Sequence, residues 1–136
     1  LKNKVEVIIS TASRTFMGGG SGTDDEVHID LGDGQGWIRL DNEDDNFENG
    51  QTDRFTLMGA RLATCDVKLK TEGDDGWDFW GAVIRDYNEP TTELPYREVS
   101  FKPKDYNGQI TFNYNTYLVN LNARSGYVTK DSAGRC

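Results

Sequence analysis

Apolar and polar residues alternate along many short pieces of this chain, and no piece carries the repeat of an amphipathic helix. In residues 27–31, for example, three apolar residues are separated by His28 and Asp30. A period of two places successive side chains on opposite faces of a strand, so each piece predicts a strand with one buried face. The pieces are residues 4–9, 27–31, 37–40, 52–57, 65–70, 82–84, 97–101 and 110–114.

Turns rich in Gly, Pro, Asn and Asp separate these pieces. Short strands with a turn about every ten residues predict an all-β fold, a β-sandwich. The stretch from residue 122 onward has few apolar residues and is expected to form a tail. The inward positions of successive strands give the expected core: Val7, Ile29, Phe55, Val67, Ile84 and Phe112.

Length and charge narrow the function. The chain has 136 residues, enough for one domain but not for two. Its net charge of −8 makes nucleic acid an unexpected partner and opposes direct attraction to anionic lipid. A role at a membrane would therefore require a metal ion or apolar loop tips. The sequence has neither a long apolar run nor a signal-peptide pattern, so we expect a soluble, already processed piece.

The two cysteines, Cys65 in a predicted strand and Cys136 at the last position, allow more than one interpretation. A disulfide is favoured, because it would tie the C-terminal tail to the domain and stabilise the fold by about 4 to 5 kcal/mol. It would also imply an oxidising, secreted setting. The alternative is a buried Cys65 thiol with Cys136 in a disordered tail.

Three acidic loops fall between the predicted strands, at residues 21–26, 41–46 and 72–76. Calcium takes six to eight hard oxygen ligands from carboxylates and carbonyls, and glycine lets a loop turn its carbonyls inward. The composition therefore suits calcium, although most acidic surface loops are simply solvated. The 41–46 loop lacks the glycine and glutamate positions of an EF-hand.

Longer motifs carry a family resemblance. Residues 5–31, VEVIISTASRTFMGGGSGTDDEVHIDL, are similar to a first strand, a variable loop and a Gly-Thr-Asp turn. NFENGQTDRFTL (46–57), GWDFWGAVI (76–84) and ITFNYNTYL (110–118) follow in the expected order. Together they resemble the PLAT (polycystin, lipoxygenase, alpha-toxin) or lipoxygenase-homology domain family. Tyr114 departs from the pattern, since many members have cysteine there.

The resemblance implies a β-sandwich of two four-stranded antiparallel sheets in residues 1–118, with residues 119–136 as an extension that a disulfide ties back. Family members are non-catalytic modules that target an attached catalytic or toxin domain to membrane lipid or to a protein partner, often with calcium. By this resemblance, a first calcium site would use Gly22, Asp75 and Gly76, although Gly20 replaces an acid found in the toxin. A second site would use Thr23, Asp24, Asp41, Asn42, Asp44 and Asn46, with Asp45 as an adjacent candidate.

The aromatic residues divide into two groups. Trp77 and Phe79 match positions that build the sandwich core, whereas Trp80 falls between matched positions and is a candidate for membrane or partner contact. Phe16 and Met17, before the glycine run, are candidates of the same kind, with a bent-back hydrophobic plug as the alternative. The single histidine, His28, alternates with buried positions and is expected to face solvent.

The sequence offers no nucleophile triad and no zinc motif, so catalysis by this chain is not expected. The predicted function is a secreted, calcium-dependent module that targets membrane lipid or a protein. Two alternatives remain: a carbohydrate-binding module, which a flat platform of Trp37 and Trp80 would favour, and a calcium-independent protein-docking domain.

Overall fold

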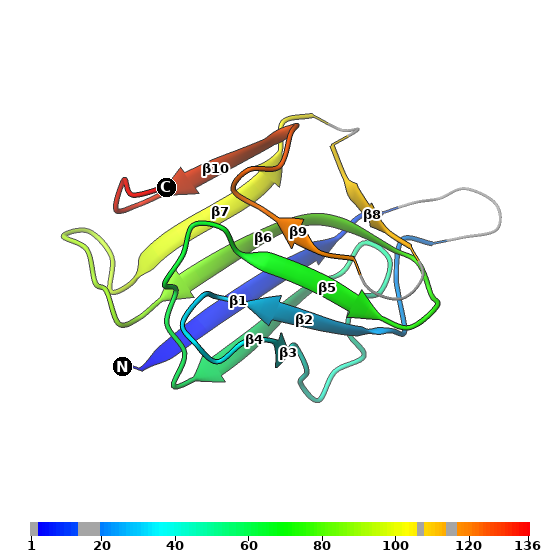
Figure 1. Cartoon of the computed structure of the whole chain (residues 1–136), viewed down its shortest axis with the longest axis horizontal. Helices are drawn as coiled ribbons and strands as arrows, with labels where there is room; N and C mark the ends of the chain where they lie inside the picture. The colour runs from blue at the N-terminus through cyan, green and yellow to red at the C-terminus, as the bar shows by residue number, and fades with distance from the viewer. Residues whose placement is uncertain (1–2, 14–19, 106–107, 114–116) are drawn as a thin grey trace.

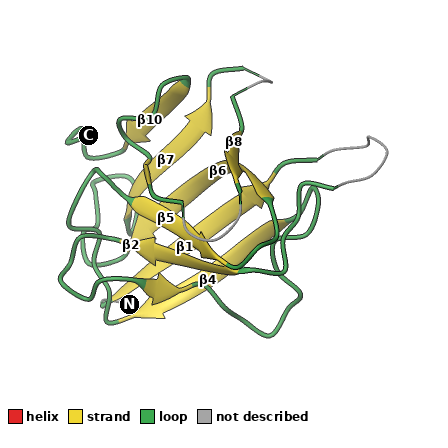
Figure 2. Ribbon diagram, turned by 45° about the vertical axis from the view of Figure 1, so that its right-hand side comes forward, coloured by secondary structure: helices red, strands yellow, loops and turns green. Residues whose placement is uncertain are grey.

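A computed structural model describes residues 3–13, 20–105, 108–113 and 117–136. In these residues the chain forms ten strands in two antiparallel sheets packed as layers, with loops between them and no helix (Figures 1 and 2). It follows that the described part has no helix able to cross a membrane. The strands are β1 (Lys4–Thr11), β2 (Glu26–Asp30), β3 (Ile38–Arg39), β4 (Thr52–Met58), β5 (Lys68–Glu72), β6 (Trp77–Asp86), β7 (Arg97–Pro103), β8 (Ile110–Phe112), β9 (Val119–Asn120) and β10 (Tyr127–Asp131).

The larger sheet has six strands in the order β10-β7-β6-β1-β4, with β8 also paired to β6. The smaller sheet has four, in the order β3-β2-β5-β9. The predicted all-β sandwich is thus confirmed, but one sheet is larger than the four strands expected. Two features account for the extra strands. β10 adds an edge beside β7, and β6 is long enough to pair with β8 from Trp77 to Phe79 and with β7 from Ala82 to Asp86.

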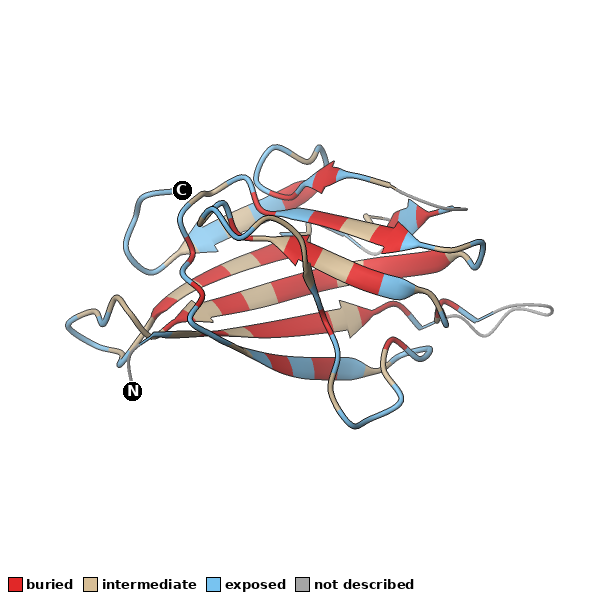
Figure 3. Cartoon of the chain, turned by 60° about the horizontal axis from the view of Figure 1, so that its bottom comes forward, coloured by how far each residue is buried: buried red, intermediate tan, exposed pale blue. Residues whose placement is uncertain are grey.

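The core lies between the two sheets. All six predicted core residues are at most 2% exposed, which confirms the alternation argument. Figure 3 shows buried and more exposed residues alternating along the strands, as expected when each strand turns one face inward. Burial of this apolar surface is the main driving force for the fold.

An aromatic cluster fills the core at the start of β6. Trp77 packs edge-on against Phe47 and Phe79, with ring centroids 5.4 and 5.6 Å away, and lies 5.1 Å from Phe112. Its indole Nε1 donates a hydrogen bond of 3.0 Å to Thr11 Oγ1, so the buried polar atom is satisfied. The expected core role of Trp77 and Phe79 is confirmed, at 1% and 0% exposure.

The C-terminal segment contributes to both sheets, since β9 joins the smaller one and β10 forms an edge of the larger one. Tyr127 in β10 is buried, although the scarcity of apolar residues after residue 122 had predicted a tail outside the core. The predicted disulfide between Cys65 and Cys136 is confirmed. Cys65 lies in the loop before β5, however, and not in a strand, because the pairing of β5 with β2 begins at Lys68.

Candidate functional site

The three acidic loops meet at one end of the sandwich. The turn from β5 to β6 and the start of β2 lie at the right of Figure 1, whereas β1 begins and β10 ends at the left. Hydrogen bonds join the loop before β2 both to the loop between β3 and β4 and to the turn before β6. Acidic segments far apart in sequence therefore form one continuous edge, which we call the acidic edge (residues 20–26, 40–49 and 72–76).

Gly22 lets two of these loops approach closely. The amide of Thr23 donates a hydrogen bond of 2.9 Å to the carbonyl of Phe47. A Cβ on Gly22 would lie 2.8 Å from that carbonyl oxygen and 3.0 Å from the amide nitrogen of Asn49. Both neighbours are backbone atoms, so they could not move aside cheaply. The glycine of the Gly-Thr-Asp turn is thus required by the contact between the loops.

Reciprocal hydrogen bonds link the first loop to the turn before β6. The amide of Asp24 donates to Asp75 Oδ2 at 2.8 Å, and the amide of Asp75 donates to Asp25 Oδ2 at 2.9 Å. A Cβ on Gly73 would overlap the Asp25 carboxylate. These contacts hold the carboxylates of Asp25 and Asp75 close together, where their negative charges repel each other.

The first and second loops enclose a cavity of about 170 Å³, which we call the acidic cavity. Six acidic residues line it, with Arg39 as the cationic residue among the described lining positions. Arg39 lies 3.6 Å from Glu26 and 4.0 Å from Asp41, and it is 53% exposed, so these pairs compensate little of the charge. The lining is Thr23, Asp24, Asp25, Glu26, Val27, Arg39, Leu40, Asp41, Asp44, Asp45, Asn46 and Phe47.

One polar atom beside this cavity lacks a partner. Asn46 Oδ1 is buried and accepts no hydrogen bond from the described residues. A buried, unpaired carbonyl oxygen costs about 1 to 3 kcal/mol. A hard cation in the acidic cavity could use this oxygen, because amide carbonyls and carboxylates are the ligands calcium prefers.

The backbone of the second loop is fixed by its neighbour Phe47. This residue has a left-handed backbone with φ of 61°, which is uncommon outside glycine. Its side chain is buried, and its amide donates a hydrogen bond of 2.8 Å to Asp53 Oδ2. The core and a buried carboxylate therefore hold the chain in the turn that places Asn46 beside the cavity.

The acidic edge carries uncompensated negative charge. Burial raises the pKa of Asp53, and repulsion from Asp44 and Asp45 raises it further. The hydrogen bond from the Phe47 amide offsets this increase only in part. Burial likewise raises the pKa of Asp25. The hydrogen bond from the Asp75 amide lowers this pKa, but repulsion from the neighbouring aspartates raises it further. Repulsion from Asp45 raises the pKa of Glu48. A bound cation would relieve this repulsion.

A second and wider cavity, of about 500 Å³, lies on the other side of the first loop. Its carboxylates come from Asp24, Glu48, Asp75 and Asp78. Gly20, where the family resemblance leads us to expect an acid, lies against Asn49: a Cβ there would be 3.2 Å from the Asn49 Cβ. This wider cavity therefore offers a cation fewer close ligands than the acidic cavity.

The residues predicted to bind metal lie around these two cavities, with Asn42 as the exception. Thr23 and Asp24 border both cavities. Asn42 borders neither cavity. Its side-chain Nδ2 donates a hydrogen bond of 2.8 Å to the carbonyl of Arg54, and its Oδ1 accepts one of 2.8 Å from the backbone amide of Asp44. Its side chain therefore stabilises the loop. Gly22, Asp75 and Gly76 line the wider cavity, and Asp41, Asp44 and Asn46 line the acidic cavity.

Sequence reasoning missed Asp25 and Glu26 as lining residues of the acidic cavity. They adjoin Asp24 in the same acidic run, which was the available signal. Asp25 lies in the loop before β2 and Glu26 is the first residue of that strand, so strand alternation does not yet separate them and both can reach one cavity.

The residues predicted to contact a membrane or a partner do not lie together. Phe16 and Met17 lie outside the described residues. Trp80 is half-buried within β6 and borders a hollow with Ser10 and Thr52, so it lies on the outer face of the larger sheet rather than on a loop tip. Trp37 packs under Lys70 of the smaller sheet, 5.0 Å from ring centroid to Nζ. The two indoles thus lie on different sheets and do not form one platform.

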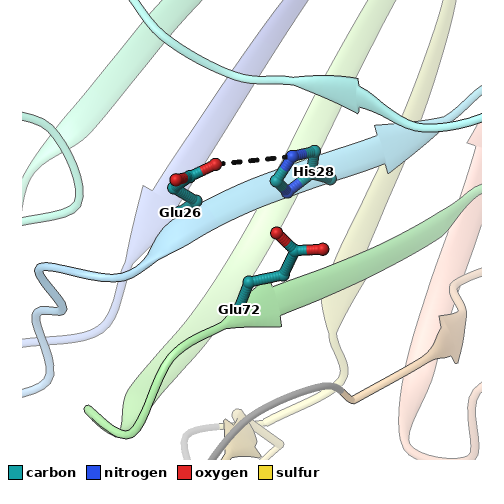
Figure 4. Close-up of side chains that lie close together, drawn as sticks. All are labelled: Glu26, His28 and Glu72. Carbon is teal, nitrogen blue, oxygen red and sulfur yellow. Dashed lines mark ion pairs between the residues drawn. The ribbon is translucent and has the colours of Figure 1, made fainter.

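His28 differs from its prediction. Its side chain points outward from β2, yet it is only 13% exposed. Lys70 lies opposite it on β5 and Arg39 opposite it on β3, and these long side chains flank the ring. Glu26 and Glu72 approach it on the same face (Figure 4).

Comparisons with known proteins agree with this fold. No family model and no curated protein matches the sequence. The solved structure of coral 8R-lipoxygenase matches with a TM-score of 0.59 and 17% identity, over 86% of this chain and 16% of that one. The alpha toxin from Clostridium absonum matches with a TM-score of 0.57 and 22% identity, over 86% of this chain and 31% of that one. The chain thus spans less than a third of either neighbour.

A lipoxygenase and an alpha toxin are two of the proteins from which the PLAT family takes its name, and the predicted PLAT-type fold is confirmed by these matches. The coral lipoxygenase is described as activated by calcium via a C2-like domain.

Proposed function

We propose that this chain is a non-catalytic, calcium-binding module that brings an attached protein to a membrane surface. The observation that carries the proposal is the acidic cavity: carboxylates from two loops line it together with Asn46, whose buried Oδ1 has no hydrogen-bond partner among the described residues. The coral 8R-lipoxygenase, which is described as activated by calcium via a C2-like domain, supports the same interpretation.

The ligand chemistry favours calcium over other common cations. The oxygens come from Thr23, Asp24, Asp41, Asp44 and Asn46, and the described lining includes neither histidine nor cysteine. Calcium accepts six to eight such oxygens in flexible geometry, whereas zinc favours nitrogen and sulfur. Partial solvent exposure of the loops indicates modest affinity, on the order of 10⁻⁴ to 10⁻³ M, as in extracellular modules.

Calcium would convert the acidic edge from a repulsive surface to an attractive one. The chain carries a net charge of −8, and its acidic loops would repel lipid phosphates. Each bound Ca²⁺ adds two positive charges at that edge and can accept phosphate oxygens in open coordination positions. The module is therefore expected to bind anionic membranes only when calcium is present.

The disulfide between Cys65 and Cys136 supports a secreted location, because such bonds persist in oxidising compartments. The attached protein would be a catalytic or toxin domain. The carbohydrate alternative loses its main argument, because Trp37 and Trp80 lie on different sheets.

The test combines calorimetry with co-sedimentation on vesicles of phosphatidylcholine and phosphatidylserine. Asp41→Asn removes an exposed charge from the acidic cavity and should weaken calcium binding at least tenfold and abolish calcium-dependent sedimentation. Asp66→Asn changes an equally exposed acid far from the cavity and should leave both unchanged. No heat and no thermal stabilisation at several millimolar Ca²⁺ would contradict the metal site. Equal sedimentation with and without calcium would contradict the proposed switch.

A further inference from the structure

Glu26, His28 and Glu72 form a cluster of side chains that can ligate a metal, beside the acidic cavity. Glu26 and His28 lie on the outer face of β2, and Glu72 ends the neighbouring strand β5. One ligand atom from each lies within 4.8 Å of the others. Figure 4 shows the three side chains gathered on one face of the smaller sheet.

The strand register makes this cluster costly without a counter-ion. Glu26 lies directly opposite Glu72, and His28 lies opposite Lys70. Like charges directly opposite each other destabilise an antiparallel pair, so this register favours a cation between the two carboxylates.

The histidine ring provides a second, independent observation. His28 Nδ1 is buried and has no hydrogen-bond partner among the described residues. The other ring nitrogen, Nε2, is 3.7 Å from Glu26 Oε1. This separation is longer than a hydrogen bond, so the neutral ring can offer a nitrogen to a metal ion.

Two surface cations partly balance the carboxylates. Lys70 Nζ lies 2.7 Å from Glu72 Oε1, and Arg39 Nε lies 3.6 Å from Glu26 Oε1. Arg39 is 53% exposed, so its pair contributes about 0 to 1 kcal/mol, whereas Lys70 is only 15% exposed and makes the firmer pair. A bound metal would have to displace Lys70 from Glu72, so Lys70 is the main competing cation.

We propose that Glu26, His28 and Glu72 bind a transition-metal dication of the Zn²⁺ class. One imidazole and two carboxylates suit zinc, copper or nickel, whereas calcium does not favour nitrogen ligands. Ligand bonds of about 2.0 to 2.2 Å require the three atoms to close to roughly 3.5 Å of one another. Glu26 and Glu72 are 47% and 46% exposed, so both can make this movement. The site shares Glu26 with the lining of the acidic cavity, but its zinc-type ligand set does not rest on the proposed calcium function.

The test uses the only histidine of the sequence as its reporter. Zn²⁺ is titrated into the chain while the imidazole signals are followed by ¹H–¹⁵N NMR and the heat is measured by calorimetry. Saturable shifts of the ring nitrogens are expected. His28→Gln should lower Zn²⁺ affinity at least tenfold, and Lys70→Gln should raise it, because a competing cation is removed.

Asp44→Asn is the matched control, since Asp44 lines the acidic cavity and belongs to neither the cluster nor the ion pairs of Arg39; the Zn²⁺ affinity of this variant should equal that of the unmodified chain. Glu26 is unsuitable for the control because it also borders that cavity. The proposal is overturned if millimolar Zn²⁺ leaves the imidazole signals of the unmodified chain unmoved, or if His28→Gln binds Zn²⁺ as tightly as the unmodified chain.

Discussion

The ion pair of Arg97 and Asp131 is the polar contact that most directly anchors the C-terminal segment. Arg97 donates from Nε to Asp131 Oδ1 at 3.0 Å and from Nη2 to Oδ2 at 2.8 Å. The two side chains are 5% and 1% exposed. Three backbone amides also donate to this carboxylate, from Ala133, Arg135 and Cys136. We predict that Asp131→Asn strongly destabilises the fold.

The magnitude follows from the pKa of Asp131. Burial alone would raise it, but the hydrogen bonds from Arg97 and from the backbone outweigh burial and lower the pKa to about 2, from an ordinary value of 3.8. This difference corresponds to about 2 kcal/mol. Because the folded pKa is depressed, this stability is present above pH 4 to 5 and is lost as pH falls toward about 2. Without the Asp131 carboxylate, the buried Arg97 would keep the more distant Glu89, 3.9 Å away, as its carboxylate neighbour, and the total cost rises to about 3 to 5 kcal/mol.

Urea denaturation of the oxidised chain at several pH values measures this effect. At pH 7 the variant should be less stable by about 3 to 5 kcal/mol, and the gap should narrow by about 2 kcal/mol as pH approaches 2. Asp66→Asn, at an exposed position, should change stability little at any pH. A gap between Asp131→Asn and the unmodified chain that stays constant from pH 6 to pH 2 would refute the electrostatic reasoning.

Two further predictions concern stability and loop contact. Reduction of the Cys65–Cys136 disulfide, which closes a sequence separation of 71, should lower stability by about 4 kcal/mol in urea titrations and expose the last residues to proteolysis; two alkylatable thiols in the unreduced folded chain would contradict the bond. Gly22→Ala should cost about 1 to 3 kcal/mol and weaken calcium binding in calorimetry, because its Cβ would meet backbone atoms at 2.8 and 3.0 Å. Gly76→Ala is the matched control, since its nearest contact would be an ordinary 3.6 Å, and an equal loss there would contradict the steric argument.

The sequence alone was informative where local chemistry decides. Alternation identified which side chains face the core, because a strand turns successive residues to opposite faces whatever its partner is. It therefore placed Val7, Phe55 and Ile84 correctly. The acidic loops were visible for the same reason: charge and glycine content are properties of a short segment.

Strand neighbours and side-chain partners were decided only by the tertiary structure. The register of β2 against β5 sets Glu26 opposite Glu72 and covers His28, which alternation alone had assigned to solvent. Asn42 is drawn away from the acidic cavity by the carbonyl of Arg54, a contact twelve residues away in sequence. Such pairings depend on which strands and loops meet in space, and the periodicity of one segment carries no information about its distant partner.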